Sequence, residues 1–137
     1  MDNSEKRLNH VFFYGLYMDP ELLKAKGVEP RDSRKAVAKG YRLRIGRMAT
    51  LMRDSKAEAH GLVYALTHDE VNTLYWGAGL NAYVAESLLV ETEDNEEIPV
   101  ICCNLLIPPE EEERNPEYLD KLKQCMSKLG LPAPNGS

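Results

Sequence analysis

The sequence of 137 residues lacks a long apolar run, an excess of basic charge and a paired-cysteine motif, and each absence excludes a class of protein. No hydrophobic stretch approaches the roughly 20 residues of a membrane-spanning helix. The formal net charge of -5 argues against nonspecific nucleic-acid binding, which requires clustered lysine and arginine. The arginines that do cluster have the alternating spacing of an exposed strand face: Arg42, Arg44, Arg47 and Arg53. We therefore expect neither a membrane nor a nucleic acid as a partner.

The cysteines also point away from metal binding and from secretion. Cys102, Cys103 and Cys125 form no CxxC or other metal-ligand spacing. Adjacent residues of a strand point to opposite faces, so Cys102 and Cys103 are poor disulfide partners. The charged first ten residues show no signal-peptide pattern. These features predict a cytoplasmic protein with no metal site and no cofactor.

The most unusual stretch is VFFYGLYMDPELL, at residues 11–23. Its first four residues are typical of a β-strand, and Gly15 permits a turn or a close backbone approach. Asp19 is a good N-cap and Pro20 a good first helical residue, which predicts a short helix that ends near Gly27. A strand, a glycine turn and a helix start aim backbone N–H groups at one point. That geometry suits an anionic ligand, but it also occurs in plain strand-to-helix turns.

The rest of the chain predicts more strands than helices. Strand-like segments, rich in apolar residues and bounded by turn signals, are residues 35–46, 48–53, 59–66, 82–92 and 98–107, of which the first two could form one bent strand. One helix follows the capping box of Thr67 and Glu70, and another follows Asn115. Mostly sequential strands with few helical crossovers predict a single α+β domain over residues 1–137, with its core at about 11–132. We expect a small, bent, mostly antiparallel β-barrel flanked by short helices, since a barrel removes exposed strand edges.

Four segments, in order along the chain, resemble the gamma-glutamylcyclotransferase-like (AIG2-like) family. FFYGLYM resembles the family's aromatic-Tyr-Gly-x-x-Met/Leu turn, and AHGLVYALTHDEVNTLY resembles the strand and helix that follow it. The strand from Tyr83 and the closing NPEYLDKLKQCMSKLGLP are similar to the family's later strand and C-terminal helix. The resemblance implies a bent β-barrel with a cavity at one end, lined by residues 14–18.

The resemblance also implies a reaction. In this family's enzymes the free α-amine of a γ-glutamyl compound attacks its own side-chain carbonyl, which gives 5-oxoproline and releases an amine or an amino acid. Because the nucleophile belongs to the substrate, the enzyme needs a general base but no nucleophilic serine or cysteine. Backbone N–H groups in the glycine turn could bind the substrate's carboxylate or the amide oxygen. The substrate-binding candidates are Tyr14, Gly15, Leu16, Tyr17, Met18 and Tyr83.

The sequence departs from the family at the position of the base. The family's catalytic glutamate lies in a Leu-Asp-x-x-Glu-Gly type of motif. Aligned on Leu74, this chain has Tyr75 in place of the aspartate and Ala78 in place of the glutamate. An alanine cannot transfer a proton, so the usual mechanism is not available at this position.

Glu86 is the alternative candidate for the catalytic base. Strand alternation places it on one face with three aliphatic residues, and a buried or paired carboxylate there would have a raised pKa. In the opposite register, Tyr83 and Leu89 face the core and Glu86 faces water.

Three functions therefore remain open. The first is a cyclotransferase-type enzyme that uses Glu86 or another relocated carboxylate, and the second is a catalytically inactive relative that binds a small molecule. The third is a protein-interaction domain whose Tyr75-Trp76 edge contacts a partner or a second copy. We expect a monomer or homodimer that binds a γ-glutamyl or related amide. A buried carboxylate beside Tyr14 would favour the enzyme, and an apolar cavity would favour binding.

Overall fold

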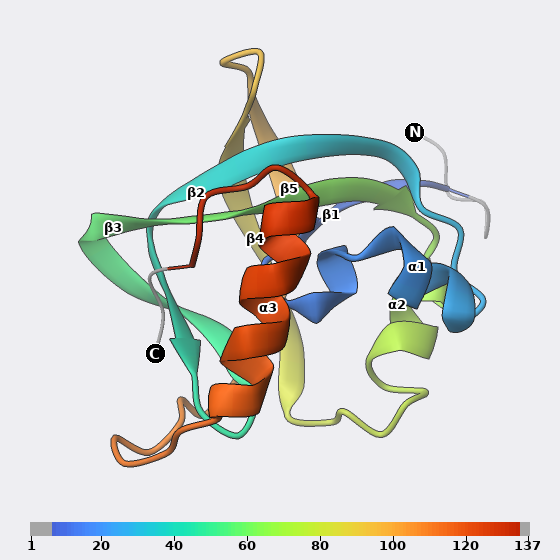
Figure 1. Cartoon of the computed structure of the whole chain (residues 1–137). Helices are drawn as coiled ribbons and strands as arrows, with labels where there is room; N and C mark the ends of the chain where they lie inside the picture. The colour runs from blue at the N-terminus through green and yellow to red at the C-terminus, as the bar shows by residue number, and fades with distance from the viewer. Residues whose placement is uncertain (1–6, 135–137) are drawn as a thin grey trace.

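In residues 7–134, which the computed structural model describes, five strands close into a barrel (Figure 1). They are β1 (Asn9–Phe13), β2 (Arg31–Ile45), β3 (Ala49–Leu66), β4 (Tyr83–Thr92) and β5 (Glu97–Leu105). Their order around the barrel is β1-β3-β2-β4-β5, and β5 meets β1 in parallel at Val11 and Ile101. The other pairings are antiparallel. The predicted α+β class with a mostly antiparallel barrel is therefore confirmed. The first six residues, on which part of the argument against a signal peptide rests, lie outside the described range.

The strand β3 differs most from the sequence-based expectation. The sequence predicts separate strands at 48–53 and 59–66, but one strand runs through both and includes the polar residues between them. β3 pairs with β2 at Arg53 and again at Glu58, on the two sides of a register shift near Gly40, whose φ is 85°. The register gives residues 54–57 no partner in β2, so these mostly polar residues form an irregularity inside one continuous strand, and the apolar segments on both sides of it stay paired.

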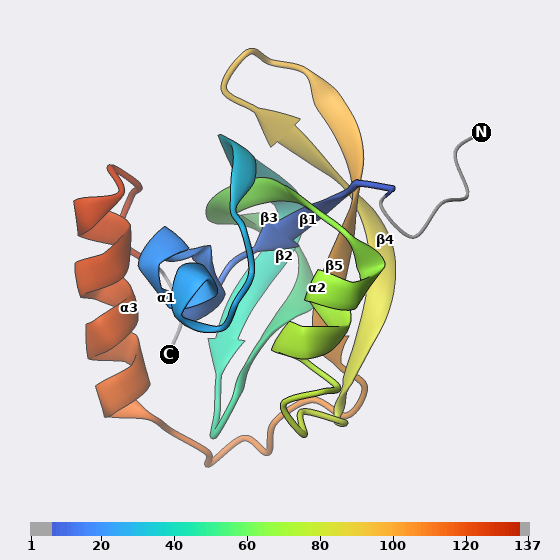
Figure 2. The same cartoon turned by 90° about the vertical axis from the view of Figure 1, so that its right-hand side faces the viewer.

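Short helices cover the barrel, and all but the first begin where the sequence predicts. They are the 3-10 helix η1 (Leu16–Met18), α1 (Pro20–Ala25), α2 (His68–Leu74) and α3 (Pro116–Lys128). The side chains of Asp19, Thr67 and Asn115 accept hydrogen bonds from the first turns of α1, α2 and α3. Figure 2 shows α1 and α3 on one side of the strands and α2 nearer to β4.

Arg44 corrects the expectation that the clustered arginines form an exposed strand face. Its side chain is buried, and its guanidinium donates hydrogen bonds to the main-chain carbonyls of Ile45, Glu110 and Glu113. A buried guanidinium is tolerated when its donors find acceptors. Arg44 therefore fastens the acidic loop that precedes α3 to the end of β2.

Candidate functional site

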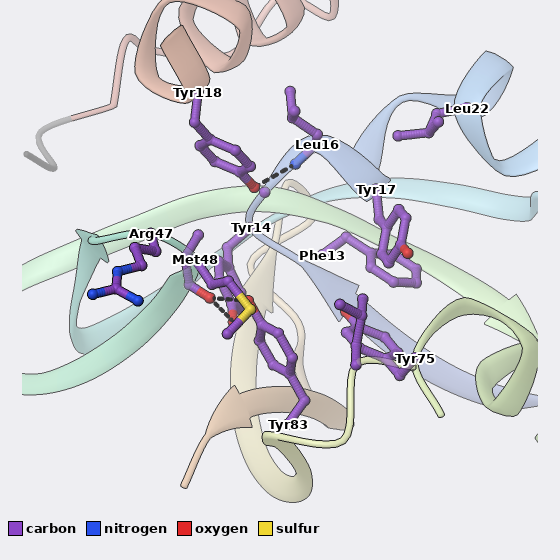
Figure 3. Close-up of a pocket in the computed structure, with 13 residues that line it drawn as sticks. Phe13, Tyr14, Leu16, Tyr17, Leu22, Arg47, Met48, Tyr75, Tyr83 and Tyr118 are labelled. Carbon is purple, nitrogen blue, oxygen red and sulfur yellow. Dashed lines mark hydrogen bonds between the residues drawn. The ribbon is translucent and has the colours of Figure 1, made fainter. Parts of the chain in front are cut away.

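A cavity of about 260 Å³ opens at the end of the barrel where β1 passes into η1 (Figure 3). Its lining comes from four parts of the described chain: Phe13, Tyr14, Gly15, Leu16, Tyr17 and Leu22; Arg47, Met48 and Ala49; Tyr75, Leu80 and Tyr83; and Tyr118. The volume is just below the roughly 300–1,000 Å³ range of ligand pockets. The cavity therefore suits a small ligand.

Gly15 is needed because the ring of Tyr118 lies directly against it. A Cβ atom at Gly15 would collide with the Tyr118 hydroxyl, so only glycine allows this approach. The Leu16 N–H donates a hydrogen bond of 3.1 Å to the same hydroxyl (Figure 3). The turn thus presents a backbone donor to the cavity, and a tyrosine from α3 accepts from it.

Three tyrosines of the cavity wall donate their hydroxyl protons to main-chain carbonyls. Tyr14 donates to the Cys103 carbonyl at 2.7 Å, and Tyr83 donates to the Ala49 carbonyl at 2.6 Å. Tyr17 donates to the carbonyl of Leu74 at 2.6 Å. Burial raises the pKa of each of these phenols, so they stay neutral. Their hydrogen bonds fix the wall of the cavity.

Tyr75 is also buried in the wall, but its hydroxyl differs from those of its neighbours. Its side chain is 7% exposed, and its ring lies 5.4 Å from the ring of Tyr17 and 5.3 Å from that of Tyr83. Within residues 7–134, no hydrogen bond involves its hydroxyl. Burial raises the pKa of Tyr75 well above its ordinary value. Tyr75 is therefore a neutral donor with a free proton.

The charge of the cavity comes from Arg47 alone among the described lining residues. Arg47 is exposed and lies at the rim, and no described carboxylate comes within 4.0 Å of its guanidinium. The Glu113 carboxylate instead accepts hydrogen bonds from the backbone N–H groups of Arg47 and Glu110. These bonds, with the nearby positive charges of Arg47 and Arg44, lower the pKa of Glu113. The cavity therefore has a positive rim and a neutral, aromatic interior.

The predicted substrate-binding residues lie together, with one exception. Tyr14, Gly15, Leu16, Tyr17 and Tyr83 all line the cavity. Met18 does not line it, because its side chain is fully buried and its carbonyl accepts a hydrogen bond from the Tyr64 hydroxyl at 2.7 Å. Contact of these residues with a ligand stays a prediction.

Neither the candidate base Glu86 nor Ala78, at the family's glutamate position, lies in the cavity wall. Glu86 shares its strand face with Leu88 and Val90 but is exposed, and its Oε1 accepts a hydrogen bond of 3.0 Å from Asn104 Nδ2. Ala78 is exposed in the turn after α2 and does not line the cavity either. Of the residues described, no carboxylate lines the cavity. A catalytic role for Glu86 stays a prediction.

The sequence reasoning missed part of the wall: Arg47, Met48, Tyr75, Leu80 and Tyr118. Tyr118 carries a usable signal, because it lies four residues before the buried Leu122 and therefore on the inward face of α3. The interaction-domain hypothesis places Tyr75 at an exposed edge with Trp76. In the structure Tyr75 is buried, Trp76 is half-buried, and the indole N–H of Trp76 donates to the carbonyl of Tyr83. These positions remove the exposed aromatic edge on which the interaction-domain hypothesis rested.

Other reactive groups are inert or absent from the site. Desolvation raises the pKa of the Cys103 thiol to about 11, and it raises that of Cys102 further, so neither is a ready nucleophile. Across residues 7–134, no three His, Cys, Asp or Glu side chains lie close enough to form a metal site. No helix in that range has the length and hydrophobicity to span a membrane.

Comparisons with known proteins place this geometry in a family. The family described as gamma-glutamyl cyclotransferase, AIG2-like, matches residues 11–122. A solved structure of a gamma-glutamyl cyclotransferase has 20% identity over 92% of this chain and 82% of its own, with a TM-score of 0.74. The Arabidopsis thaliana protein At5g39720.1 has 22% identity over 96% and 97%, with a TM-score of 0.68. An AIG2-like protein of Mus musculus has 14% identity over 85% and 94%, with a TM-score of 0.60.

No curated protein sequence matches this one. The solved structures share the fold of this chain, but at 14% to 22% sequence identity they do not indicate its substrate. The family match, however, covers most of the chain and includes the strand, glycine turn and helix that form the cavity. The chain therefore belongs to the gamma-glutamyl cyclotransferase, AIG2-like, family.

Proposed function

We propose that the cavity binds a small γ-glutamyl compound, that is, a glutamate derivative whose side chain is an amide. The observation that carries the proposal is the pairing of an aromatic, hydroxyl-bearing interior with an unpaired guanidinium at the rim. A γ-glutamyl compound has a carboxylate for the guanidinium and an amide carbonyl for a hydroxyl of the wall that is not already used by the main chain. Its methylene groups would pack against the rings, which supply most of the lining.

The same geometry favours binding over catalysis by the usual route. Ring closure needs a base that removes a proton from the attacking amine and returns it to the leaving group. Neither Ala78, at the family's glutamate position, nor any described carboxylate lies in the wall. We therefore assign the protein as a small-molecule-binding member of its family.

Cyclisation to 5-oxoproline, with Glu86 as the base, is the second candidate. A chain of contacts that links Glu86 to the cavity wall favours this candidate. Glu86 accepts a hydrogen bond from the buried Asn104. The neighbour of Asn104 in sequence, Cys103, has a carbonyl that accepts from Tyr14 in the cavity wall. This route requires the carboxylate to reach the substrate from outside the present wall.

The setting of the protein belongs to the same proposal. We propose a cytoplasmic monomer or homodimer, since all three cysteines are free thiols, as expected in a reducing compartment. A small molecule is the proposed ligand, with neither nucleic acid nor membrane as a partner.

Calorimetry with a set of γ-glutamyl amines and amino acids tests the binding proposal. We expect saturable binding that Arg47→Gln weakens about tenfold, because the ligand loses its charge-assisted hydrogen bonds. Lys56→Gln is the matched control, since it removes the same charge from an exposed residue outside the cavity. If no compound binds, the proposal is wrong.

Mass spectrometry of 5-oxoproline in the same mixtures separates binding from catalysis. We expect no release above the uncatalysed rate from the wild type. We expect none from Ala78→Glu either, because residue 78 is exposed and outside the cavity wall. Release by the wild type that Glu86→Gln abolishes would establish the second candidate instead.

A further inference from the structure

We propose that the cavity selects γ-glutamyl amides of uncharged amines, with Arg47 binding the ligand's one carboxylate and the Tyr75 hydroxyl donating to its amide carbonyl. The inference rests on the proposed function and adds to it the class of ligand and the residue that recognises the amide. Three features of the wall support it: its charge, its free hydroxyl and its apolar surface.

The charge of the wall matches a ligand that carries a single carboxylate and no charge on its amine portion. Among the described lining residues, Arg47 is the sole charged side chain. A γ-glutamyl amino acid would bring a second carboxylate into the cavity, and a γ-glutamyl diamine would bring a second ammonium. Neither charge would find a partner of opposite sign in the wall, and burying an unpaired charge is costly. The α-ammonium, adjacent to the carboxylate, would remain at the solvent-exposed rim.

The hydroxyl of Tyr75 is available because the other tyrosines of the wall already have partners. Tyr14, Tyr17 and Tyr83 donate to main-chain carbonyls, and the Tyr118 oxygen accepts from the Leu16 N–H, although within the described residues its proton has no acceptor. Tyr75 has no such bond within residues 7–134. A hydroxyl with no protein partner is uncommon on a side chain that is so nearly buried, because its lost hydration is only partly compensated.

The position of Tyr75 directs this free donor to the cavity. The described chain contains no fully buried polar side-chain atom that lacks a hydrogen bond. The Tyr75 hydroxyl has no partner, so it is not fully buried and must be part of the small surface, 7% of the residue, that stays accessible. Because Tyr75 lines the cavity, we infer that this surface faces the cavity. The ring is held between those of Tyr17 and Tyr83, so the donor is fixed in place (Figure 3). A neutral phenol pairs well with a neutral carbonyl oxygen.

The rest of the wall suits the amine portion of the ligand. Apolar side chains surround the remaining space: Phe13, Leu16, Leu22, Met48 and Leu80. An alkyl or aryl amine would bury its surface against them, whereas a charged side chain would lose its hydration.

Three ligands with the same γ-glutamyl group and the same alkyl chain test the charge rule by calorimetry. They are the γ-glutamyl amides of pentylamine, of norleucine, which adds a carboxylate, and of cadaverine, which adds an ammonium. We expect the pentylamide to bind at least about tenfold more tightly than either of the others. Equal or tighter binding of the norleucine or cadaverine compound overturns the inference.

Tyr75→Phe tests the recognition of the carbonyl. We expect the pentylamide to bind about fivefold to tenfold more weakly to this variant, with an unchanged thermal midpoint. Tyr41→Phe, outside the cavity, should bind as the wild type does. A straight-chain α-amino acid of the same length, in which methylenes replace the amide, should bind equally to wild type and Tyr75→Phe.

The outcomes distinguish this inference from the proposed function. If the wild type binds the pentylamide and Tyr75→Phe binds it equally well, the inference is overturned and the binding function stands. If the wild type binds none of the three γ-glutamyl compounds, both are overturned.

Discussion

The two ends of the seven-residue helix α2 use polar side chains in opposite ways. At its start, charged side chains form a network in which the Glu70 carboxylate accepts hydrogen bonds from Arg31, from the Thr67 N–H and from the Glu29 N–H. Just past its end, Tyr75 carries a neutral hydroxyl that has no partner in the described chain. Saturated charges thus join α2 to its neighbours, whereas the neutral hydroxyl of Tyr75 stays without a partner in the described chain, and our proposal assigns this hydroxyl to the ligand.

At the saturated end, hydrogen bonds rather than burial determine the pKa of the partly buried group. Partial burial by itself would raise the pKa of Glu70, but the hydrogen bonds from Arg31, Thr67 and Glu29 outweigh it and lower that pKa to about 2. The Arg31 to Glu70 distance is 2.8 Å, and the Glu70 side chain is 15% exposed, so solvent screens the pair only in part. The network therefore joins α2 to the start of β2.

Glu70→Ala should have the largest effect on stability. It removes both the ion pair with Arg31 and half of the capping box, so we expect a loss of about 3 to 4 kcal/mol in the free energy of unfolding. Chemical denaturation measures it. Glu21→Ala is the control, because Glu21 makes only an exposed pair with Lys24 and should cost less than about 0.5 kcal/mol. Similar losses for the two variants would contradict the structural role of the network.

Acid should weaken the same end of α2 by a somewhat smaller amount. The pKa of Glu70 is about 2 in the folded protein and near its ordinary 4.5 when unfolded. Its contribution is thus complete above pH 4.5 and is lost as the pH falls towards 2, by at most about 3 kcal/mol. The measurement is the difference in unfolding free energy between wild type and Glu70→Gln across this range. A difference that does not change with pH would show that Glu70 titrates normally.

Two tyrosines of the cavity should give the smallest effects and the sharpest contrast. Tyr14→Phe leaves the Cys103 carbonyl without its donor, so we expect a loss of about 1 to 2 kcal/mol. Tyr75→Phe breaks no hydrogen bond of the described chain, so its unfolding free energy should stay within about 0.5 kcal/mol of the wild type. Thermal and denaturant unfolding of both variants test this. A larger loss for Tyr75→Phe would show that its hydroxyl serves the fold.

The features that the sequence predicted correctly are local. Asp19, Thr67 and Asn115 each cap a helix through a backbone N–H two or three residues away, so the residues next to them in the sequence suffice to identify them as caps. The strand pair β4 and β5 was also predictable, since the two strands follow one another across a short turn. The family resemblance, carried by four segments in order along the chain, predicted the barrel and a cavity lined by residues 14–18, of which all but Met18 line the cavity found.

The features that the sequence missed depend on distant partners. Arg44 was expected in solvent, but acceptors at Glu110 and Glu113 make its burial possible. For Glu86 the sequence left both faces open, and in the structure its carboxylate is exposed and accepts a hydrogen bond from the amide of Asn104 on the adjacent strand. In both cases strand alternation gives two faces, and only the packing of other elements decides which face is buried.

By itself, the sequence determined the helix starts, the strand content and the family of this protein, because these depend on neighbouring residues and on ordered motifs. Only the tertiary structure decided the chemistry of the cavity. It brings Arg47, Tyr75 and Tyr118 to the turn at Gly15 from three separate parts of the chain. It also determines which tyrosine hydroxyls find a carbonyl, which one accepts from a backbone N–H, and that within the described residues the hydroxyl of Tyr75 finds no partner. The physical reason is that a hydroxyl's partner is set by distances in space, and barrel closure fixes those distances between residues far apart in sequence.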